Sequence, residues 1–148
     1  MTTSALPNST IRELFSGRID RKIEEVIKVD QNDVAIVRQE IDEYILTESI
    51  EHNMLKVLEG YRQSVNQPSG DIAIWVAGFF GAGKSSFAKY LGLALSNRDL
   101  DGESAGDLLG RRANNQAIKA LLGAIKEQIP TEAIIFDVSA DRNVNAND

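Results

Sequence analysis

Residues 78–85, Gly-Phe-Phe-Gly-Ala-Gly-Lys-Ser, match the P-loop pattern G-x-x-x-x-G-K-[ST] at every fixed position. A loop that wraps phosphates brings its backbone N–H groups close to them, and a Cβ would obstruct that approach. Gly78, Gly81 and Gly83 remove this obstacle and permit positive φ angles. Lys84 would reach the β- and γ-phosphates of ATP. The stretch therefore predicts a nucleotide-binding loop, with or without hydrolysis, and the alternative is a glycine-rich turn that binds no ligand.

The other residues of this stretch have supporting roles in the prediction. The Ser85 hydroxyl would bind Mg²⁺, and the Ser86 hydroxyl is a weaker candidate for a bond to the α-phosphate. Phe79, Phe80 and Ala82 belong to the same predicted binding loop. The two phenylalanines would either pack against neighbouring elements, which we favour, or approach the nucleotide base. The expected ligands are ATP and Mg²⁺.

Hydrolysis also needs an acidic residue that holds Mg²⁺, usually at the end of an apolar strand. Asp137, which follows the apolar run 133–136, is the candidate by pattern. The alternative, which we favour, is that Asp137 simply ends the next strand. The residue after it is Val138, so the acidic pair common in hydrolysing ATPases is absent.

Further candidate residues carry weaker signals. The stretch 98–112 predicts a loop with one short turn. The arginine pair in it, Arg111 and Arg112, would act as an arginine finger or, as we favour, lie in solvent. His52 is expected either at the surface or as a histidine whose ring nitrogens have hydrogen-bond partners. Trp75 is expected in the core.

Composition limits the classes of function. The chain has 148 residues, about one domain, and its 43% hydrophobic content is sufficient for a core. Cysteine is absent and His52 is the one histidine, which excludes disulfides and thiolate metal sites and makes a zinc site or a Ser-His-Asp triad improbable. The net charge of −6 disfavours a stand-alone nucleic-acid binder. No apolar run predicts a membrane span or a signal peptide, so a cytoplasmic location is expected.

Helical spacing of apolar residues recurs in three regions. Residues 34–63 predict two helices or one bent helix, and Asn32 or Asp33 would cap the first N-terminus. Apolar stripes over residues 87–97 and 118–129 predict two further helices.

Two apolar runs predict strands and, with the P-loop, an α/β fold. Residues 72–77 show no alternation, as in a strand buried on both faces of a parallel sheet, and 133–136 predict a second, shorter strand. The expected organisation is an irregular N-terminal segment (1–33), a helical extension with a linker (34–70) and the start of a P-loop NTPase domain (71–148). Because such a domain needs about five strands, we expect an incomplete, AAA+-like parallel sheet.

Three blocks carry a resemblance to a known family: IRELFSGRIDRKIEEVIKVDQND, EIDEYILTESI and IWVAGFFGAGKSSFAKYLG. In order and spacing they resemble the N-terminal part of the P-loop ATPase of BREX phage-resistance systems, the BrxC/PglY family. The resemblance runs from about Ile11 to Arg142. The upstream blocks and the double phenylalanine make it more specific than the P-loop alone.

The resemblance implies a large bacterial, cytoplasmic AAA+-like ATPase that works with a DNA methyltransferase and other defence proteins. The chain would then be its opening segment. The family's nucleotide site falls on Gly78, Gly81, Gly83, Lys84 and Ser85. Its later metal-binding acid, sensor residues and arginine finger have no matching position here, so hydrolysis would need the missing remainder. A homo-oligomer is also possible in such a family, and DNA would be touched only indirectly or through other regions.

Two functions from different classes therefore remain open. The first is ATP binding by part of a defence ATPase. The second is a protein-interaction module without hydrolysis, in which residues 34–63 and the N-terminal segment dock another subunit of the defence complex. A small P-loop kinase is disfavoured because about 70 residues precede the predicted first strand.

Overall fold

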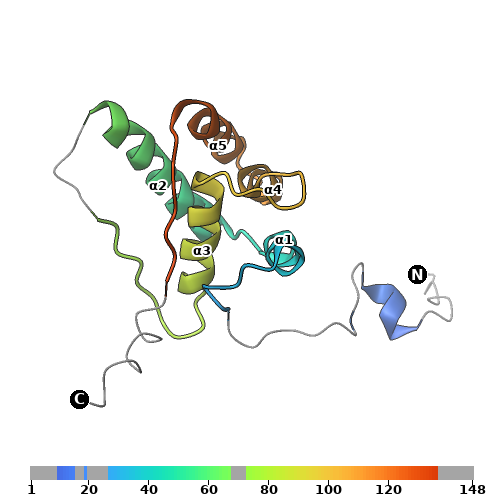
Figure 1. The fold of residues 1–148 in the computed structure, drawn as a ribbon. Helices are drawn as coiled ribbons and strands as arrows, with labels where there is room; N and C mark the ends of the chain where they lie inside the picture. The colour runs from blue at the N-terminus through green and yellow to red at the C-terminus, as the bar shows by residue number, and fades with distance from the viewer. Residues whose placement is uncertain (1–9, 16–18, 20–26, 68–72, 137–148) are drawn as a thin grey trace, which may run out of the picture.

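The computed structural model describes residues 10–15, 19, 27–67 and 73–136 (Figure 1). Within these ranges the chain forms a short 3₁₀ helix and five α-helices. They are η1 (Ile11–Leu14), α1 (Val34–Glu43), α2 (Glu48–Asn66), α3 (Lys84–Leu95), α4 (Ala105–Arg112) and α5 (Gln116–Gln128). The β-type pairing in this part of the chain is a single antiparallel bridge between Asp99 and Ser104.

The predicted α/β fold with an incomplete parallel sheet is wrong, because the described residues form helices and no strand. The runs predicted as strands, 72–77 and 133–136, contain no strand where the structure describes them. Trp75, predicted in the core, is 91% exposed. A short continuous apolar run fits a buried strand only where neighbouring strands cover it. Here the helices fill the core among themselves and leave both runs outside it.

Side-chain caps explain where the helices begin. Asp33 Oδ1 accepts hydrogen bonds from the backbone N–H groups of Ala35 and Ile36, at 3.0 and 3.2 Å. Thr47 caps α2 in the same way, as its hydroxyl accepts from the N–H of Ile50. Such caps satisfy amide groups that lack an acceptor within the helix. The prediction of two helices in the region 34–63 is confirmed, with Asp33 as the cap of the first.

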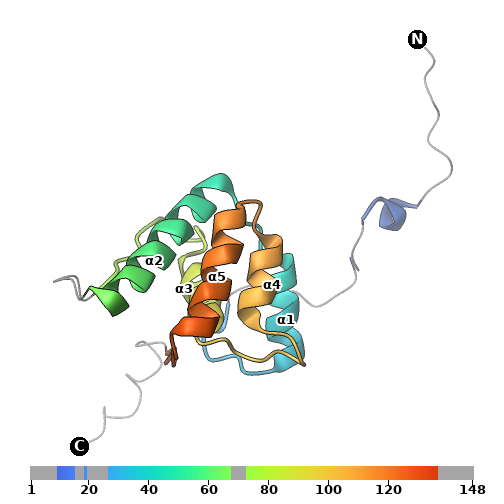
Figure 2. The same ribbon diagram turned by 90° about the horizontal axis from the view of Figure 1, so that it is seen from above.

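Four helices lie next to one another in the order α2, α5, α4, α1, as Figure 2 shows, and α3 packs against α4 and α5. The residues between them form one apolar core. Its most deeply buried side chains come from all five helices and the loop before α4: Ile41, Met54, Leu58, Tyr90, Leu100, Leu108, Leu109, Ile118 and Ile125. The helical stripes predicted from the sequence supply most of this core.

Polar groups also connect the helices inside this body. Lys89 of α3 is 1% exposed, and its ammonium donates to Glu40 Oε2 of α1 at 2.7 Å and to the backbone carbonyl oxygen of Lys28 at 2.8 Å. The buried Glu51 carboxylate of α2 accepts the backbone N–H of Asn114, just before α5, at 2.6 Å. A buried charge is tolerated when it is paired in this way. The Lys89 bonds connect α3 to α1 and to the segment before α1, and the Glu51 bond connects α2 to the start of α5.

Candidate nucleotide-binding site

The glycine-rich loop ends where α3 begins, and its backbone has the conformation that the motif predicts at two of three glycines. Gly81 has φ 79°, and Gly83, the N-cap of α3, has φ 78°. Side chains other than glycine rarely adopt this left-handed region. At Gly78 a Cβ would lie 3.4 Å from Cβ of Ala82 and 3.7 Å from Cδ of Lys84, which is ordinary van der Waals contact. The backbone of the loop therefore favours glycine at positions 81 and 83.

Lys84 is the first residue of α3, and its side chain turns back over the loop. Its ammonium donates a hydrogen bond to the backbone carbonyl oxygen of Phe79 at 2.8 Å. The N–H of Ala82 donates to the same oxygen at 3.2 Å. The positive charge of Lys84 thus lies beside the loop that the motif assigns to phosphates.

The first turn of α3 presents amide donors next to this charge. The first backbone bond of the helix runs from the N–H of Phe87 to the carbonyl oxygen of Gly83, at 2.9 Å. The N–H groups of residues 84–86 therefore have no acceptor within the helix. No side chain caps this end of α3. Free amides and the positive end of the helix dipole favour an anion here. Ser85 is exposed and Ser86 half-buried in the same turn.

A cavity of about 570 Å³ lies beside the loop. One wall is a row of polar side chains on α2, Ser49, Asn53 and Lys56. Residues 74–77 form another wall, and residues 82–84 close the end at the loop. Among the described residues that line the cavity, none is acidic. A cavity lined by both apolar and polar side chains therefore lies next to the candidate phosphate site.

The α2 wall of this cavity is the part that the sequence did not reveal. Ser49, Asn53 and Lys56 recur at spacings of four and three on the polar side of α2. That spacing is also typical of an ordinary solvated helix face. What distinguishes these side chains from other surface residues is that they share the lining of the cavity with residues 82–84 and Phe87.

The aromatic residues of the loop correct one prediction. Phe79 and Phe80 are 92% and 100% exposed, so the favoured interpretation, packing against neighbouring elements, is wrong. The loop carries them outside the helical core, where the described residues offer them no apolar partner. The opposite interpretation, contact with a base, is not tested by their position.

The weaker candidate residues fall elsewhere. Asp137 lies outside the described residues. Arg111 and Arg112 occupy the last turn of α4 rather than a loop, where positive charge suits the helix dipole. Arg111 pairs with Glu103, and Arg38 donates to the same carboxylate at 2.8 Å. Its contact with Glu103 engages Arg111 in a structural ion pair.

His52 is exposed on α2, which confirms the expectation of a surface residue. The described residues contain no group of three or more His, Cys, Asp or Glu side chains that could hold a metal ion.

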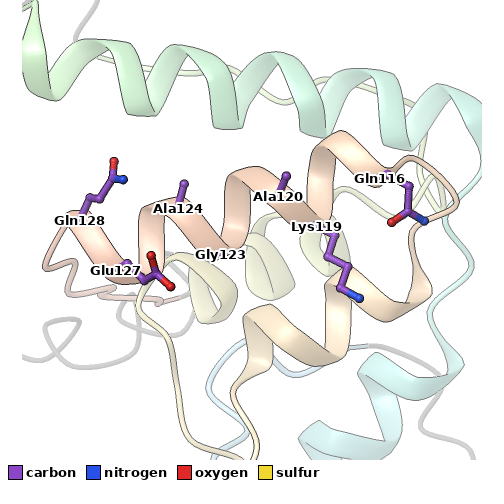
Figure 3. A pocket seen from close by; sticks show the side chains of 7 residues that line it. All are labelled: Gln116, Lys119, Ala120, Gly123, Ala124, Glu127 and Gln128. Atoms are coloured by element: carbon purple, nitrogen blue, oxygen red, sulfur yellow. The ribbon is translucent and has the colours of Figure 1, made fainter.

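A second hollow, of about 650 Å³, is lined by one face of α5 (Figure 3). Lys119 and Glu127 lie near its two ends, with Ala120, Gly123 and Ala124 between them. All its lining residues come from this one helix, and it shares none with the glycine-rich loop. We assign it no role in the candidate site.

Comparison with models of known protein families gives no match, and no solved structure matches the chain. Among the helices in the described ranges, none is long and apolar enough to cross a membrane.

Proposed function

We propose that residues 78–85 bind the phosphates of ATP together with Mg²⁺. The observation that carries the proposal is the conformation of the loop: left-handed φ angles at Gly81 and Gly83, with the Lys84 ammonium turned back over the backbone. These features support an anion site because they combine free amides, a cation and the start of a helix.

Each residue has a distinct task in this proposal. Lys84 would exchange the Phe79 carbonyl oxygen for oxygens of the β- and γ-phosphates, which are stronger partners for an ammonium group. The N–H groups of residues 84–86 would donate to phosphate oxygens. The Ser85 hydroxyl would hold Mg²⁺, which supplies positive charge to the phosphates when bound. We assign binding and not hydrolysis to the described residues, because no acidic residue among them lines the cavity.

The test is a titration of the full chain with ATP and Mg²⁺ by isothermal calorimetry. Lys84→Ala is expected to weaken ATP binding by at least about tenfold, because it removes a charge-assisted hydrogen bond. Lys119→Ala, a change at an exposed lysine on α5, is the matched control and is expected to bind like the parent chain. Equal ATP affinity in the Lys84→Ala variant and the parent, with both folded by circular dichroism, would reject the proposal.

The resemblance to the BREX ATPase family supports a biological setting for this binding. In that setting the chain would belong to a cytoplasmic defence ATPase, would work with other BREX proteins and would contact DNA only indirectly or through other regions. Oligomerisation would also fit that family. This part of the proposal rests on the three sequence blocks alone.

A second candidate function is a protein-interaction module without hydrolysis, which would dock another subunit of the defence complex. The exposure of Trp75, Phe79 and Phe80 favours it, because exposed apolar surface often marks a site for a partner. Docking through the apolar stripes of α1 and α2 is less favoured, since Ile41 and Met54 are buried in the chain's own core. An absence of ATP binding in the titration above would favour this second function.

A further inference from the structure

We propose that the cavity between α2 and residues 74–77 binds the nucleobase of the same nucleotide, and that Asn53 recognises the edge of that base. This inference rests on the proposed binding of phosphates by the loop. It assigns a site to the nucleoside, the part of the ligand beyond the phosphates. The cavity of about 570 Å³ is lined both by Gly83 and Lys84 of the loop region and by side chains of α2. A nucleotide whose phosphates lie at the loop would direct its nucleoside into this space.

The lining of the cavity suits a flat heteroaromatic ring. Ile50 and Val57 of α2, Phe87 of α3 and Tyr44 supply apolar and aromatic surface. Trp75 adds a large ring from the opposite wall. Aromatic side chains stack well on nucleobases, and a ligand pocket typically combines such surface with a few polar groups. The volume is also in the usual range for small-molecule sites.

Three polar side chains supply the specificity. Asn53 and Lys56 line the cavity, and within the described part of the chain no hydrogen bond occupies either of them. The buried hydroxyl of Tyr44, another lining residue, also has no hydrogen-bond partner there. An asparagine amide can donate and accept at once, as the adenine edge requires.

Trp75 makes the inference directly measurable. It is the one tryptophan of the chain, it lines the cavity, and it is 91% exposed. A base that stacks on Trp75 should quench its fluorescence. Inorganic tripolyphosphate carries the phosphates without a base, so it should bind at the loop and leave the fluorescence unchanged.

The experiment titrates the full chain with ATP and with tripolyphosphate, both with Mg²⁺, by calorimetry and by Trp75 fluorescence. We expect ATP to bind at least about tenfold more tightly than tripolyphosphate and to quench Trp75. Asn53→Ala should remove most of this preference and leave tripolyphosphate binding unchanged. His52→Ala, at the exposed neighbouring position on α2 that does not line the cavity, should match the parent chain.

The outcomes separate this inference from the proposed function. If ATP and tripolyphosphate bind equally well without a change in fluorescence, the base site is refuted and phosphate binding stands. If Asn53→Ala keeps the preference for ATP, the assignment of Asn53 is refuted. If neither ligand binds the parent chain, the proposed function fails and this inference fails with it.

Discussion

The helical body and the two extended segments, 73–80 and 131–136, are built from similar apolar residues but differ in burial. Leu109 and Ile118 in the body are 0% exposed, whereas Trp75 and Ile134 in the segments are 91% and 83% exposed. A helix satisfies its own backbone hydrogen bonds, and it needs a partner for one face only. An extended chain needs a neighbouring strand as well. Apolar composition alone therefore does not decide which residues enter the core.

This difference gives the candidate site two unlike sides. The α2 and α3 side belongs to the body, where Lys89 and Glu51 connect helices through buried hydrogen bonds. The opposite side is the exposed run 74–77. We expect α2 and α3 to hold Asn53 and the phosphates in position, while residues 74–77 change conformation to fit the ligand.

The largest expected effect compares a core side chain with an exposed one. Leu109→Ala should lower the free energy of unfolding by about 2–5 kcal/mol, because it removes a buried side chain and leaves a cavity. Phe80→Ala, at a residue that is 100% exposed, should change it by less than about 0.5 kcal/mol. Urea denaturation followed by circular dichroism measures both. A large loss of stability in Phe80→Ala would mean that the loop is packed in solution.

The same contrast explains how much of the molecule the sequence could predict. Spacing of apolar residues located α1, α2, α3 and α5, and Asp33 was one of the two cap candidates for α1, because periodicity and capping are local properties. The helix α4 was missed, since residues 98–112 were predicted as a loop with one short turn. The apolar runs 72–77 and 133–136 were wrongly predicted as buried strands, because a strand is buried only where residues distant in the sequence pair with it and cover it. The glycine-rich loop was predictable from a short motif. The buried pair of Lys89 with Glu40, and the part of Asn53 in the cavity, depend on tertiary packing and carry no local signal.

A smaller effect is expected at two glycines, Gly106 inside the body and Gly92 beside an extended segment. An added Cβ would meet its nearest atom at the same distance in both places. A Cβ at Gly106 in α4 would lie 3.2 Å from the backbone carbonyl oxygen of Ala94, inside the body. A Cβ at Gly92 in α3 would lie 3.2 Å from Cδ1 of Ile135, the end of a side chain on the extended segment. Gly106→Ala should therefore destabilise the chain by about 1–3 kcal/mol, since backbone cannot move aside cheaply.

Gly92→Ala should instead stabilise the chain by up to about 1 kcal/mol, because alanine favours the helix and the Ile135 side chain can shift. Gly123→Ala in α5 is the reference, since nothing lies within 4 Å of its added Cβ. Thermal or urea unfolding of the three variants gives the comparison. If Gly92→Ala is as destabilising as Gly106→Ala, residues 131–136 are held as firmly as the core.

The smallest expected effect concerns the surface of the body, where an exposed ion pair connects α4 and α5. Asp107 Oδ2 accepts a hydrogen bond from the Lys126 ammonium at 2.8 Å and another from the Ser104 hydroxyl at 2.7 Å. The Lys126 bond, followed by that of Ser104, holds the pKa of Asp107 below its usual value. The folded chain thus binds this proton less readily than the unfolded chain, so the interaction stabilises the fold at neutral pH and is lost as the pH falls through the Asp107 pKa.

Asp107→Asn should cost at most about 1 kcal/mol at pH 7, because the pair is exposed to solvent. The difference from the parent chain should shrink as the carboxyl is protonated at acidic pH. Asp101→Asn, the same change at an exposed turn residue, controls for the loss of charge. Urea midpoints measured from pH 7 down to pH 3 test this, and a difference that grows toward low pH would contradict the assigned role. A surface pair that weak would leave the apolar core as the main source of the body's stability, with the extended segments outside it.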